Sequence, residues 1–392
     1  MKILILSHSQ YQKNAYIKHL ERATSLVKRG HIVTFIATSN HKKFKSEKKR
    51  VEGVSVILVP DLLWGVFRQG IGPLNIIRRI FYVLTIKFDI IHGIDCRPVT
   101  VIPVLAGKYL KKKRMFLEWT DLFGRGGTMT ERSSKLYQKT FGKVESFFEE
   151  YFRKYADGNI TISHRLKNVL LSLGYPENRI LVLPLASDMR SLITESKESL
   201  KEELNFDLSK TYLLYVGSIF PLDAELLIFS FRKLKETKDD IKLILVGKHR
   251  WLTQEIMNEL DITVTGFVSD EMLFKYIGAA DIHLLPLKTT EANLARFPCK
   301  INDYFMGAKP LVTTPISDLP LLYSKYEFGV VSKNDTVEDY TRSVLTAIEN
   351  SNKWNYWGNN AVDCAKNEFA LGIISERLEK FYNYIIKGNN NG

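Results

Sequence analysis

The sequence predicts an α/β protein with two domains, each built on a doubly wound parallel sheet. Short apolar runs of strand length alternate with stretches of helical periodicity along most of the chain. This alternation is typical of parallel sheets that carry helices on both faces. With 392 residues, the chain is also long for a single hydrophobic core. We therefore expect one domain over residues 1–187, a second over residues 188–370, and a terminal segment over residues 371–392.

The first domain opens on an apolar run, residues 2–7, which we expect to be a buried strand because it is too short for the apolar region of a signal peptide. Further strands are expected at residues 31–38, 54–59, 90–93, 115–118, 158–163 and 180–183. Helical periodicity lies between these runs, notably over residues 15–29 and 136–155. The first half therefore reads as a series of strand-helix units.

The second half repeats this pattern. Strands are expected at residues 212–216, 242–246, 262–265, 282–286 and 311–313, and helices at residues 226–235 and 272–279. Ligands bind where the carboxyl ends of parallel strands meet, so a cleft between two such domains is the expected site.

The sequence also indicates where the linker between the two domains and the C-terminal tail lie. The linker should lie near residues 184–188. Residues 354–386 carry aromatic side chains at helical spacing, and the Gly-Asn tail after Lys387 should be disordered.

Composition limits the class of protein. Hydrophobic residues make up 45% and charged residues 25%, as in soluble globular proteins. The three cysteines are too few and too widely spaced for a disulfide framework or a zinc knuckle, which fits a reducing cytoplasm. The formal net charge of +13 attracts anions. Nucleic acid is the weaker candidate, because no zinc finger, aromatic RNA-binding motif or basic zipper occurs and the excess charge sits in local clusters such as residues 42–50 and 108–114.

The segment over residues 62–84 is at once apolar, aromatic and basic. Arg68, Arg78 and Arg79 interrupt it too often for a membrane span. The mixture suits a peripheral surface on anionic lipid headgroups. The alternative interpretation is a core helix preceded by a loop.

The most informative stretch is the loop-helix-strand unit over residues 291–314. Arg296 and Lys300 are cations for a pyrophosphate, Pro298 suits the first turn of a helix, and Asp303 lies about one turn further on, where a carboxylate can take a ribose hydroxyl. Glu291 adds an acid at its start. The alternative is a solvated surface helix with a capped start.

Glycines follow several of the expected strands. Gly217 would let a diphosphate approach the backbone, and Ser218 can donate a hydrogen bond to it. Gly266, Phe267 and Val268 would receive the nucleoside base. Each glycine alternatively does no more than end a strand.

The loop over residues 118–127 carries the polar groups expected of the first domain's site. Asp121 or Glu118 can hold sugar hydroxyls and are candidate catalytic carboxylates, and Trp119 can stack on a sugar ring. Arg125 and Gly126 belong to a glycine-rich stretch that suits phosphate contact. The alternative is a glycine-rich turn between a strand and a helix.

Taken in order, these segments resemble the GT-B glycosyltransferases, specifically the retaining family 4. The matching segments are residues 89–93, 156–163, 174–184, 215–218, 245–247, 266–268 and 276–286, with Phe297 to Tyr304 fitting a variant of the family's donor loop. The resemblance implies two Rossmann-like domains, with a terminal helix that returns to the first domain. It also implies retaining transfer from a nucleoside diphosphate sugar, UDP-linked by preference and without a metal, to a lipid-linked or polysaccharide acceptor at the inner face of a membrane. A monomer or homodimer is expected.

The chain departs from the family pattern at several positions. The family's first acid falls at Ala295, so Glu291 or no residue replaces it, and Phe297 belongs to the same loop. The usual cations after Gly217 are missing, which leaves Lys248, Arg296 and above all Lys300 to balance the leaving diphosphate. The family's sugar-contacting His is absent from residues 118–127. These losses motivate the alternative of a catalytically silent subunit that binds a partner transferase.

Overall fold

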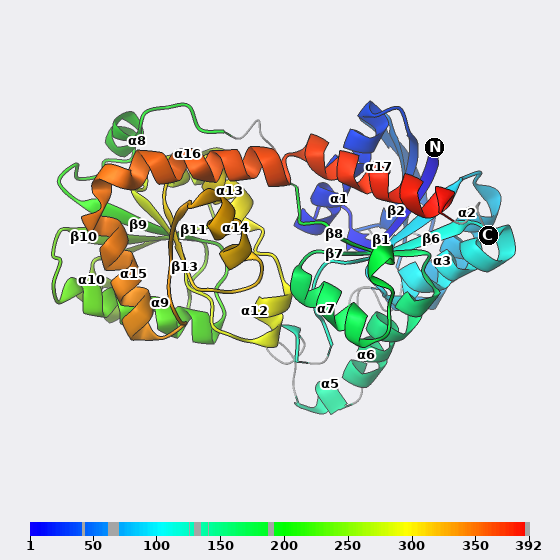
Figure 1. Ribbon diagram of the computed structural model, residues 1–392, viewed down its shortest axis with the longest axis horizontal. Helices are drawn as coiled ribbons and strands as arrows, with labels where there is room; N and C mark the ends of the chain where they lie inside the picture. The colour runs from blue at the N-terminus through cyan, green and yellow to red at the C-terminus, as the bar shows by residue number, and fades with distance from the viewer. Residues whose placement is uncertain are drawn as a thin grey trace. The chain divides into compact units, whose positions relative to one another are not determined.

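The computed structural model describes residues 1–40, 44–61, 70–124, 126–128, 135–139, 141–186 and 192–388. The chain divides into two compact units, which are coloured by position along the chain in Figure 1. The N-terminal unit comprises Met1–Ala186 and Leu371–Gly392, and the C-terminal unit comprises Ser187–Ala370.

The N-terminal unit is built on an 8-stranded sheet with the order β3-β4-β2-β1-β5-β6-β7-β8. Its strands are β1 (Lys2–Gln10), β2 (Ile32–Thr38), β3 (Glu47–Val51), β4 (Val54–Val59), β5 (Ile90–Ile94), β6 (Arg114–Trp119), β7 (Gly158–Thr161) and β8 (Ile180–Val182). All neighbours pair in parallel except β3, which pairs antiparallel with β4 at the edge. The doubly wound parallel sheet predicted from the sequence is thereby confirmed, and β3 is the strand that the sequence did not indicate.

Alternate residues of β1 point to opposite faces of this sheet, and each face has its own helices. Ile3 and Ile5 pack with helices α1 (Asn14–Lys28) and α17 (Leu371–Lys387). Leu4 and Leu6 pack on the other side with α2 (Pro73–Thr85) and α3 (Pro98–Lys111). Helix α17 lies along α1 (Figure 1), so the terminal helix belongs to the N-terminal unit as the family resemblance implied.

The remaining helical segments of this unit follow β6. They are α5 (Lys135–Lys139), α6 (Phe141–Tyr151), the 3-10 turn Phe152–Tyr155, α7 (His164–Ser172) and the 3-10 turn Glu177–Arg179. The single helix expected over residues 136–155 is therefore divided into shorter pieces.

The C-terminal unit is built on a 6-stranded parallel sheet with the order β11-β10-β9-β12-β13-β14. Its strands are β9 (Thr211–Val216), β10 (Ile241–Val246), β11 (Ile262–Gly266), β12 (Ile282–Leu285), β13 (Leu311–Thr313) and β14 (Gly329–Val331). Its helices are α8 (Lys197–Glu203), α9 (Pro221–Lys235), α10 (Gln254–Leu260), α11 (Asp270–Ala279), α12 (Glu291–Ala295), α13 (Lys300–Met306), α14 (Leu319–Tyr326), α15 (Val337–Glu349) and α16 (Trp354–Cys364), followed by the π-helical turn Ala365–Phe369.

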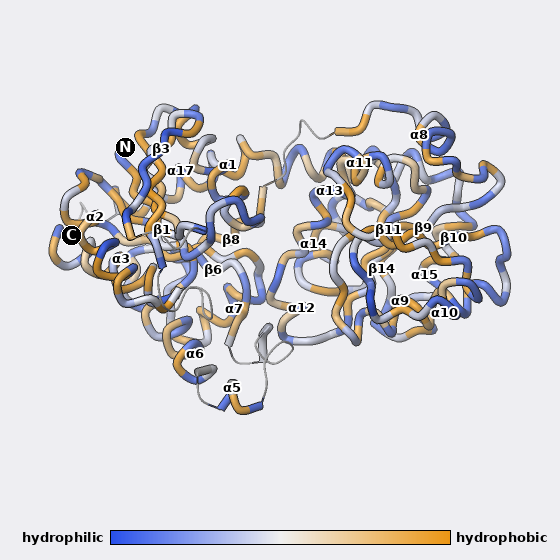
Figure 2. Tube along the Cα trace, turned by 180° about the vertical axis from the view of Figure 1, so that it is seen from behind, coloured by the Kyte–Doolittle hydropathy of each residue, from blue (hydrophilic) through white to orange (hydrophobic). Residues whose placement is uncertain are grey.

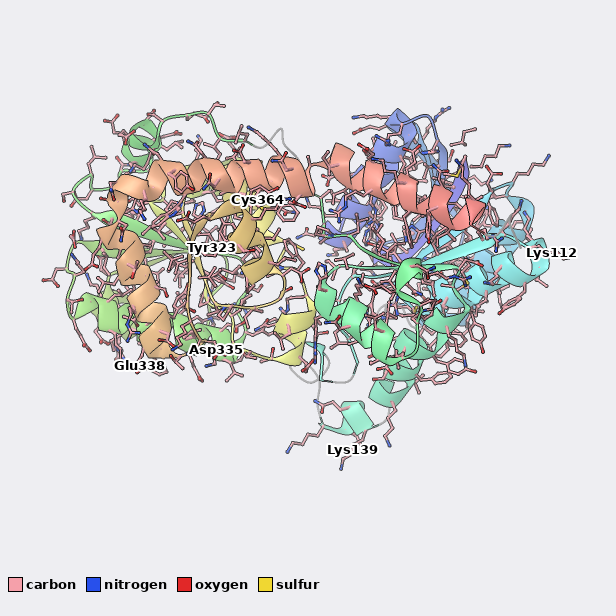
Figure 3. The ribbon with its side chains drawn as sticks, in the orientation of Figure 1. Lys112, Lys139, Tyr323, Asp335, Glu338 and Cys364 are labelled. Atoms are coloured by element: carbon pink, nitrogen blue, oxygen red, sulfur yellow. The ribbon has the colours of Figure 1, made fainter. Side chains whose placement is uncertain are left out.

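Hydrophobic positions follow the strands of both sheets (Figure 2). In the C-terminal unit the core joins β9, β10 and β12 to α9 and α15, with Phe231 and Tyr340 among its fully buried members. Cys364 lies buried at the end of α16, and it is labelled in Figure 3. Within the described part of the chain, no helix combines the length and the apolar character that crossing a membrane requires.

Each sheet has one point where the order of its strands reverses. In the C-terminal unit β10 and β12 lie on either side of β9, and in the N-terminal unit β2 and β5 lie on either side of β1. Ligands of open α/β sheets bind outside the carboxyl ends of the strands at such a switch point. The two switch points therefore locate the candidate site of each unit.

Candidate functional site

In the C-terminal unit, glycines end the three strands on one side of the switch point. Gly217 follows β9, Gly247 follows β10 and Gly266 ends β11, with φ angles of +86°, +128° and +71°. The Gly217 amide donates to the Val246 carbonyl (2.8 Å) and the Gly247 amide to the Gly266 carbonyl (3.0 Å). A Cβ at Gly217 or Gly266 would meet no atom within 4 Å, so the space beside these turns is open. The glycines are needed for the backbone angles, and the open space is available to a ligand.

Lys300 is the first residue of α13, and it is held at the end of β9. Its Nζ donates to the Tyr215 Oη (2.5 Å) and lies 3.8 Å from the Tyr215 ring centroid. The same phenol donates to the Ser218 carbonyl (2.9 Å), so the turn after β9 and Lys300 are tied to one ring. Burial lowers the pKa of Lys300 to about 7, although Asp223 opposes this shift. A bound anion would stabilise the protonated amine here.

Helix α13 is fixed by a tyrosine in its middle. The Tyr304 hydroxyl accepts from the Val216 amide (2.8 Å) and donates to the Leu284 carbonyl (3.2 Å), which ties α13 to β9 and β12. Pro298 lies two residues before the helix, not in its first turn as expected, and its carbonyl accepts from the Ile301 amide (3.1 Å). Asp303 lies in the first turn and is half-buried.

Three members of the predicted donor loop have different environments. Arg296 is half-buried, with its guanidinium 4.8 Å from the Phe220 ring centroid, and it remains a candidate phosphate cation. Glu291 is exposed at the start of α12. Phe297, in contrast, is buried against Phe369, with 5.1 Å between the ring centroids. The prediction that Phe297 contacts the donor is therefore wrong, because its ring belongs to the hydrophobic core.

The turns after β10 and β11 form a second part of this edge. Lys248 Nζ lies 4.6 Å from the Phe267 ring centroid, and 79% of Phe267 is exposed. Gly266 and Lys248 line an open hollow of about 680 Å³, and Val268 is half-buried beside Phe267. An exposed aromatic ring with a cation above it is suited to a nucleoside base.

Sequence reasoning did not find the residues that hold the loop after β12. Asp223 is buried and accepts from the Lys288 amide (2.7 Å) and the Asn293 side chain (3.0 Å). Asp335, labelled in Figure 3, accepts from the Thr289 amide (2.5 Å). These carboxylates anchor a loop from distant parts of the sequence, and no local pattern marks them.

In the N-terminal unit, the predicted role of Glu118 is not supported. Arg22 donates to both of its carboxylate oxygens (2.8 and 2.5 Å), and His92 Nε2 lies 3.2 Å away. Burial by itself raises the pKa of Glu118, but the Arg22 charge and the His92 hydrogen bond lower it well below its usual range. Glu118 is therefore a buried charge that stabilises the fold, and the prediction that it holds sugar hydroxyls or acts in catalysis is wrong.

Trp119 is likewise part of the core. It is fully buried, its Nε1 donates to Glu149 (2.8 Å), and the Arg153 guanidinium covers its ring at 4.2 Å from the centroid. It cannot stack on a sugar. Asp121 is half-buried and Gly126 is exposed with a φ of +78°, while Arg125 lies outside the described residues.

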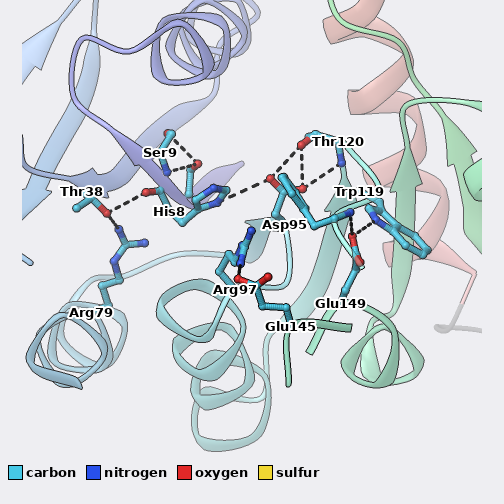
Figure 4. A network of polar contacts seen from close by, with 12 residues as sticks. His8, Ser9, Thr38, Arg79, Asp95, Arg97, Trp119, Thr120, Glu145 and Glu149 are labelled. Carbon is cyan, nitrogen blue, oxygen red and sulfur yellow. Dashed lines mark hydrogen bonds and ion pairs between the residues drawn. The ribbon is translucent and has the colours of Figure 1, made fainter. Parts of the chain in front are cut away.

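The switch point of the N-terminal unit carries a polar network that the sequence did not reveal (Figure 4). His8 Nδ1 lies 3.7 Å from Asp95, which follows β5 with a φ of +60°. The Asp95 carboxylate also accepts from the Thr120 amide (3.1 Å) and hydroxyl (2.8 Å). Burial and the charges of Arg97 and Arg79 lower the pKa of His8 to about 3, so its ring is neutral.

The loop after β6 is fastened to α6 around this network. Glu149 accepts from the amides of Phe123 (2.9 Å) and Gly124 (2.7 Å), and Arg97 pairs with Glu145 (Figure 4). The Arg97 guanidinium lies 4.7 Å from the Phe123 ring centroid. In the part of the chain that the structure describes, no cluster of His, Cys, Asp or Glu is arranged to hold a metal ion.

Comparison with known proteins decides the family. The family model described as "Glycosyltransferase Family 4" matches residues 19–190, and that described as "Glycosyl transferases group 1" matches residues 196–363. The two matches together show that the chain is a glycosyltransferase of the group 1 and family 4 type. This glycosyltransferase is 24% identical over 372 residues to an uncharacterized glycosyltransferase of Methanocaldococcus jannaschii, with 90% of each chain covered.

Solved structures agree on the GT-B fold. Anabaena HepE in complex with UDP has a TM-score of 0.74 at 15% identity and covers 98% of this glycosyltransferase and 100% of HepE. Sucrose-phosphate synthase from Thermosynechococcus elongatus has a TM-score of 0.73 at 12% identity, with 99% and 100% covered. WaaG, a glycosyltransferase involved in lipopolysaccharide biosynthesis, has a TM-score of 0.67 at 15% identity, with 98% and 100% covered.

Proposed function

We propose that this glycosyltransferase takes a sugar from a UDP-sugar and transfers it with retention to a lipid-linked or polysaccharide acceptor in cell-surface glycan synthesis. The observation that carries the donor assignment is Lys300, an amine of lowered pKa held by Tyr215 beside the open glycine turn at Gly217. HepE, which shares the fold, is found in complex with UDP and with UDP-glucose. Retention and the type of acceptor are proposed from the resemblance to family 4.

Lys300 would act on the leaving group. As the bond from the sugar to the diphosphate breaks, negative charge grows on the diphosphate oxygens, and a positioned ammonium stabilises that charge. Arg296 and Lys248 supply further positive charge at the same sheet edge. We therefore propose that the donor binds without a metal ion.

Helix α2 supports peripheral association with a membrane. Leu74, Ile77, Phe81 and Leu84 are exposed at spacings of three and four residues and so share one face, with Ile77 61% and Phe81 60% exposed. The opposite face contributes Val83 to the core, so the helix has one core face and one exposed apolar face. Residues 62–69 lie outside the described part of the chain.

Basic residues lie next to this apolar stripe. Lys48, Lys49 and Arg50 of β3 line a cavity together with Phe81 and Tyr82 of α2. An apolar stripe beside cations fits the headgroup region of an anionic bilayer. We propose a cytoplasmic enzyme on the inner face of the membrane.

A thermal-shift panel tests the donor assignment. UDP, GDP, CMP and their sugar conjugates are added separately, and a ligand that binds the native state alone raises Tm by mass action. We expect UDP and UDP-sugars to raise Tm selectively. A selective rise in Tm with GDP would show that the donor carries guanine and would reject uracil as its base. Donor hydrolysis then separates an enzyme from a silent subunit, which would bind UDP-sugars without cleaving them.

A further inference from the structure

We propose that His249 is a positioning residue for the donor's diphosphate, placed beside Lys300 to donate a hydrogen bond to a phosphate oxygen. This inference rests on the proposed function. His249 follows β10 by three residues and lines the open hollow together with Gly247 and Gly266. It therefore lies at the carboxyl edge where the glycine turns leave space for a ligand.

The position of the His249 ring is set by aromatic neighbours. Its centroid lies 6.1 Å from that of Tyr215 and 6.1 Å from that of Trp251, edge-on to both rings. Tyr215 is the residue whose hydroxyl accepts the hydrogen bond from Lys300. One tyrosine thus contacts the amine and the imidazole together.

The ring is buried without a hydrogen-bond partner. Only 4% of His249 is exposed, and among the described residues neither ring nitrogen makes a hydrogen bond of normal geometry, although the Val246 carbonyl is close enough to raise the pKa of the ring. An unsatisfied buried polar group destabilises a fold, so packing alone would favour an apolar ring at this position. A ligand that accepts a hydrogen bond from His249 removes this penalty.

Electrostatics agree with an anionic ligand. Burial and the nearby Lys300 charge lower the pKa of His249, with the Val246 carbonyl opposing, so the ring is neutral and carries one N–H donor. A neutral imidazole next to Lys300 does not repel the charge of the Lys300 amine. A diphosphate reverses the local field and accepts hydrogen bonds from both groups.

The test compares His249→Phe, which keeps a buried ring but removes the donor, with His249→Gln, which keeps an N–H group. UDP affinity is measured by calorimetry and the Tm of the ligand-free protein by thermal unfolding. We expect His249→Phe to weaken UDP affinity about tenfold or more, since the lost bond is to a charged acceptor, without lowering Tm. His249→Gln should recover part of the affinity. Arg342→Gln, an exposed change on α15 that does not line this hollow, is the control and should bind UDP as the wild type does.

The outcomes are distinct. If the wild type binds no UDP, the proposed function fails. If it binds UDP and His249→Phe binds it equally well, His249 has no role in the site. If His249→Phe lowers Tm and leaves the affinity unchanged, the residue is structural. Should His249→Phe not fold, the His249 ring nitrogen signals of the wild type, assigned with His249→Gln, are followed by NMR; unchanged signals on saturation with UDP would overturn the inference.

Discussion

Lys300 combines an ordinary position at a helix start with an unusual environment. Its amine contacts a phenol and an aromatic face, and burial brings its pKa to about 7. A cation of this kind gains most when negative charge develops beside it. Its contribution should therefore appear in turnover more than in ground-state binding.

Replacing Lys300 tests this role. Lys300→Ala should lower kcat about a hundredfold, since loss of one such contact costs about 3 kcal/mol in the transition state, and should raise donor KM much less. Lys300→Arg should recover only part of the rate, because a planar fork does not replace a compact ammonium. Lys248→Ala is the comparison in the same steady-state assay. If Lys248→Ala is inactive and Lys300→Ala is not, the two roles are exchanged.

The lowered pKa of Lys300 also predicts a pH dependence. Well below pH 7 the amine is protonated in both folded and unfolded protein. Between about pH 7 and 10.5 only the unfolded chain keeps this proton, so the group makes the free energy of unfolding rise with pH across that window. UDP favours the protonated amine. Calorimetry at pH 8 in two buffers of different ionisation enthalpy should therefore show proton uptake on UDP binding. Lys300→Arg, which stays charged, should abolish that uptake; equal uptake in both proteins would contradict the assignment.

The buried pair of Arg22 and Glu118 makes a different prediction. Glu118→Gln leaves the Arg22 guanidinium buried without its counter-charge, which should lower the free energy of unfolding by about 3–5 kcal/mol. Chemical denaturation measures this loss. UDP affinity of the folded fraction should be unaltered. A stable Glu118→Gln variant with lost sugar transfer would restore the sugar-binding role that the structure rejects.

At the scale of elements, most of the parallel strands were predicted because they are short apolar runs, whereas β14, a strand of three residues, was not predicted. Strand β3 was not predicted because Glu47–Val51 is a charged run, which an edge strand with exposed positions tolerates. Gly217 and Lys300 could be predicted as site residues because their motif is local. Tyr215, Asp223 and His249 were not, because their roles depend on neighbours that only the tertiary structure brings together.

Helix α2 allows the membrane proposal to be tested. Ile77→Asp combined with Phe81→Asp should reduce flotation with anionic vesicles, since both side chains are exposed and their loss removes apolar area without opening the core. Ile17→Asp on α1, also an exposed isoleucine, is the matched control. Binding should weaken as salt increases. Equal flotation with neutral and anionic vesicles would contradict the proposed electrostatic attraction to anionic lipid.

At the scale of the whole molecule, the fold is shared with glycosyltransferases at 12–15% identity. Identity can fall this far because the fold depends on apolar runs of strand length and on turns between them, not on particular side chains. The predictable part of the molecule is thus its two sheets and their switch points. The unpredictable part is which polar residues occupy the edges, as the exclusion of Trp119 and the appearance of the His8–Asp95 contact illustrate.

The central claim is that UDP binds at the glycine turn after β9, and a matched pair of glycines tests it most directly. Gly217 and Gly174 have φ angles of +86° and +81°, and a Cβ at either would meet no atom within 4 Å. Alanine at each should therefore cost a similar backbone strain of about 1–2 kcal/mol. Calorimetric titration with UDP should show binding to the wild type and to Gly174→Ala, and strongly weakened binding to Gly217→Ala, whose methyl group occupies the space for the diphosphate. Equal UDP affinity in all three proteins, or none in the wild type, would contradict the account.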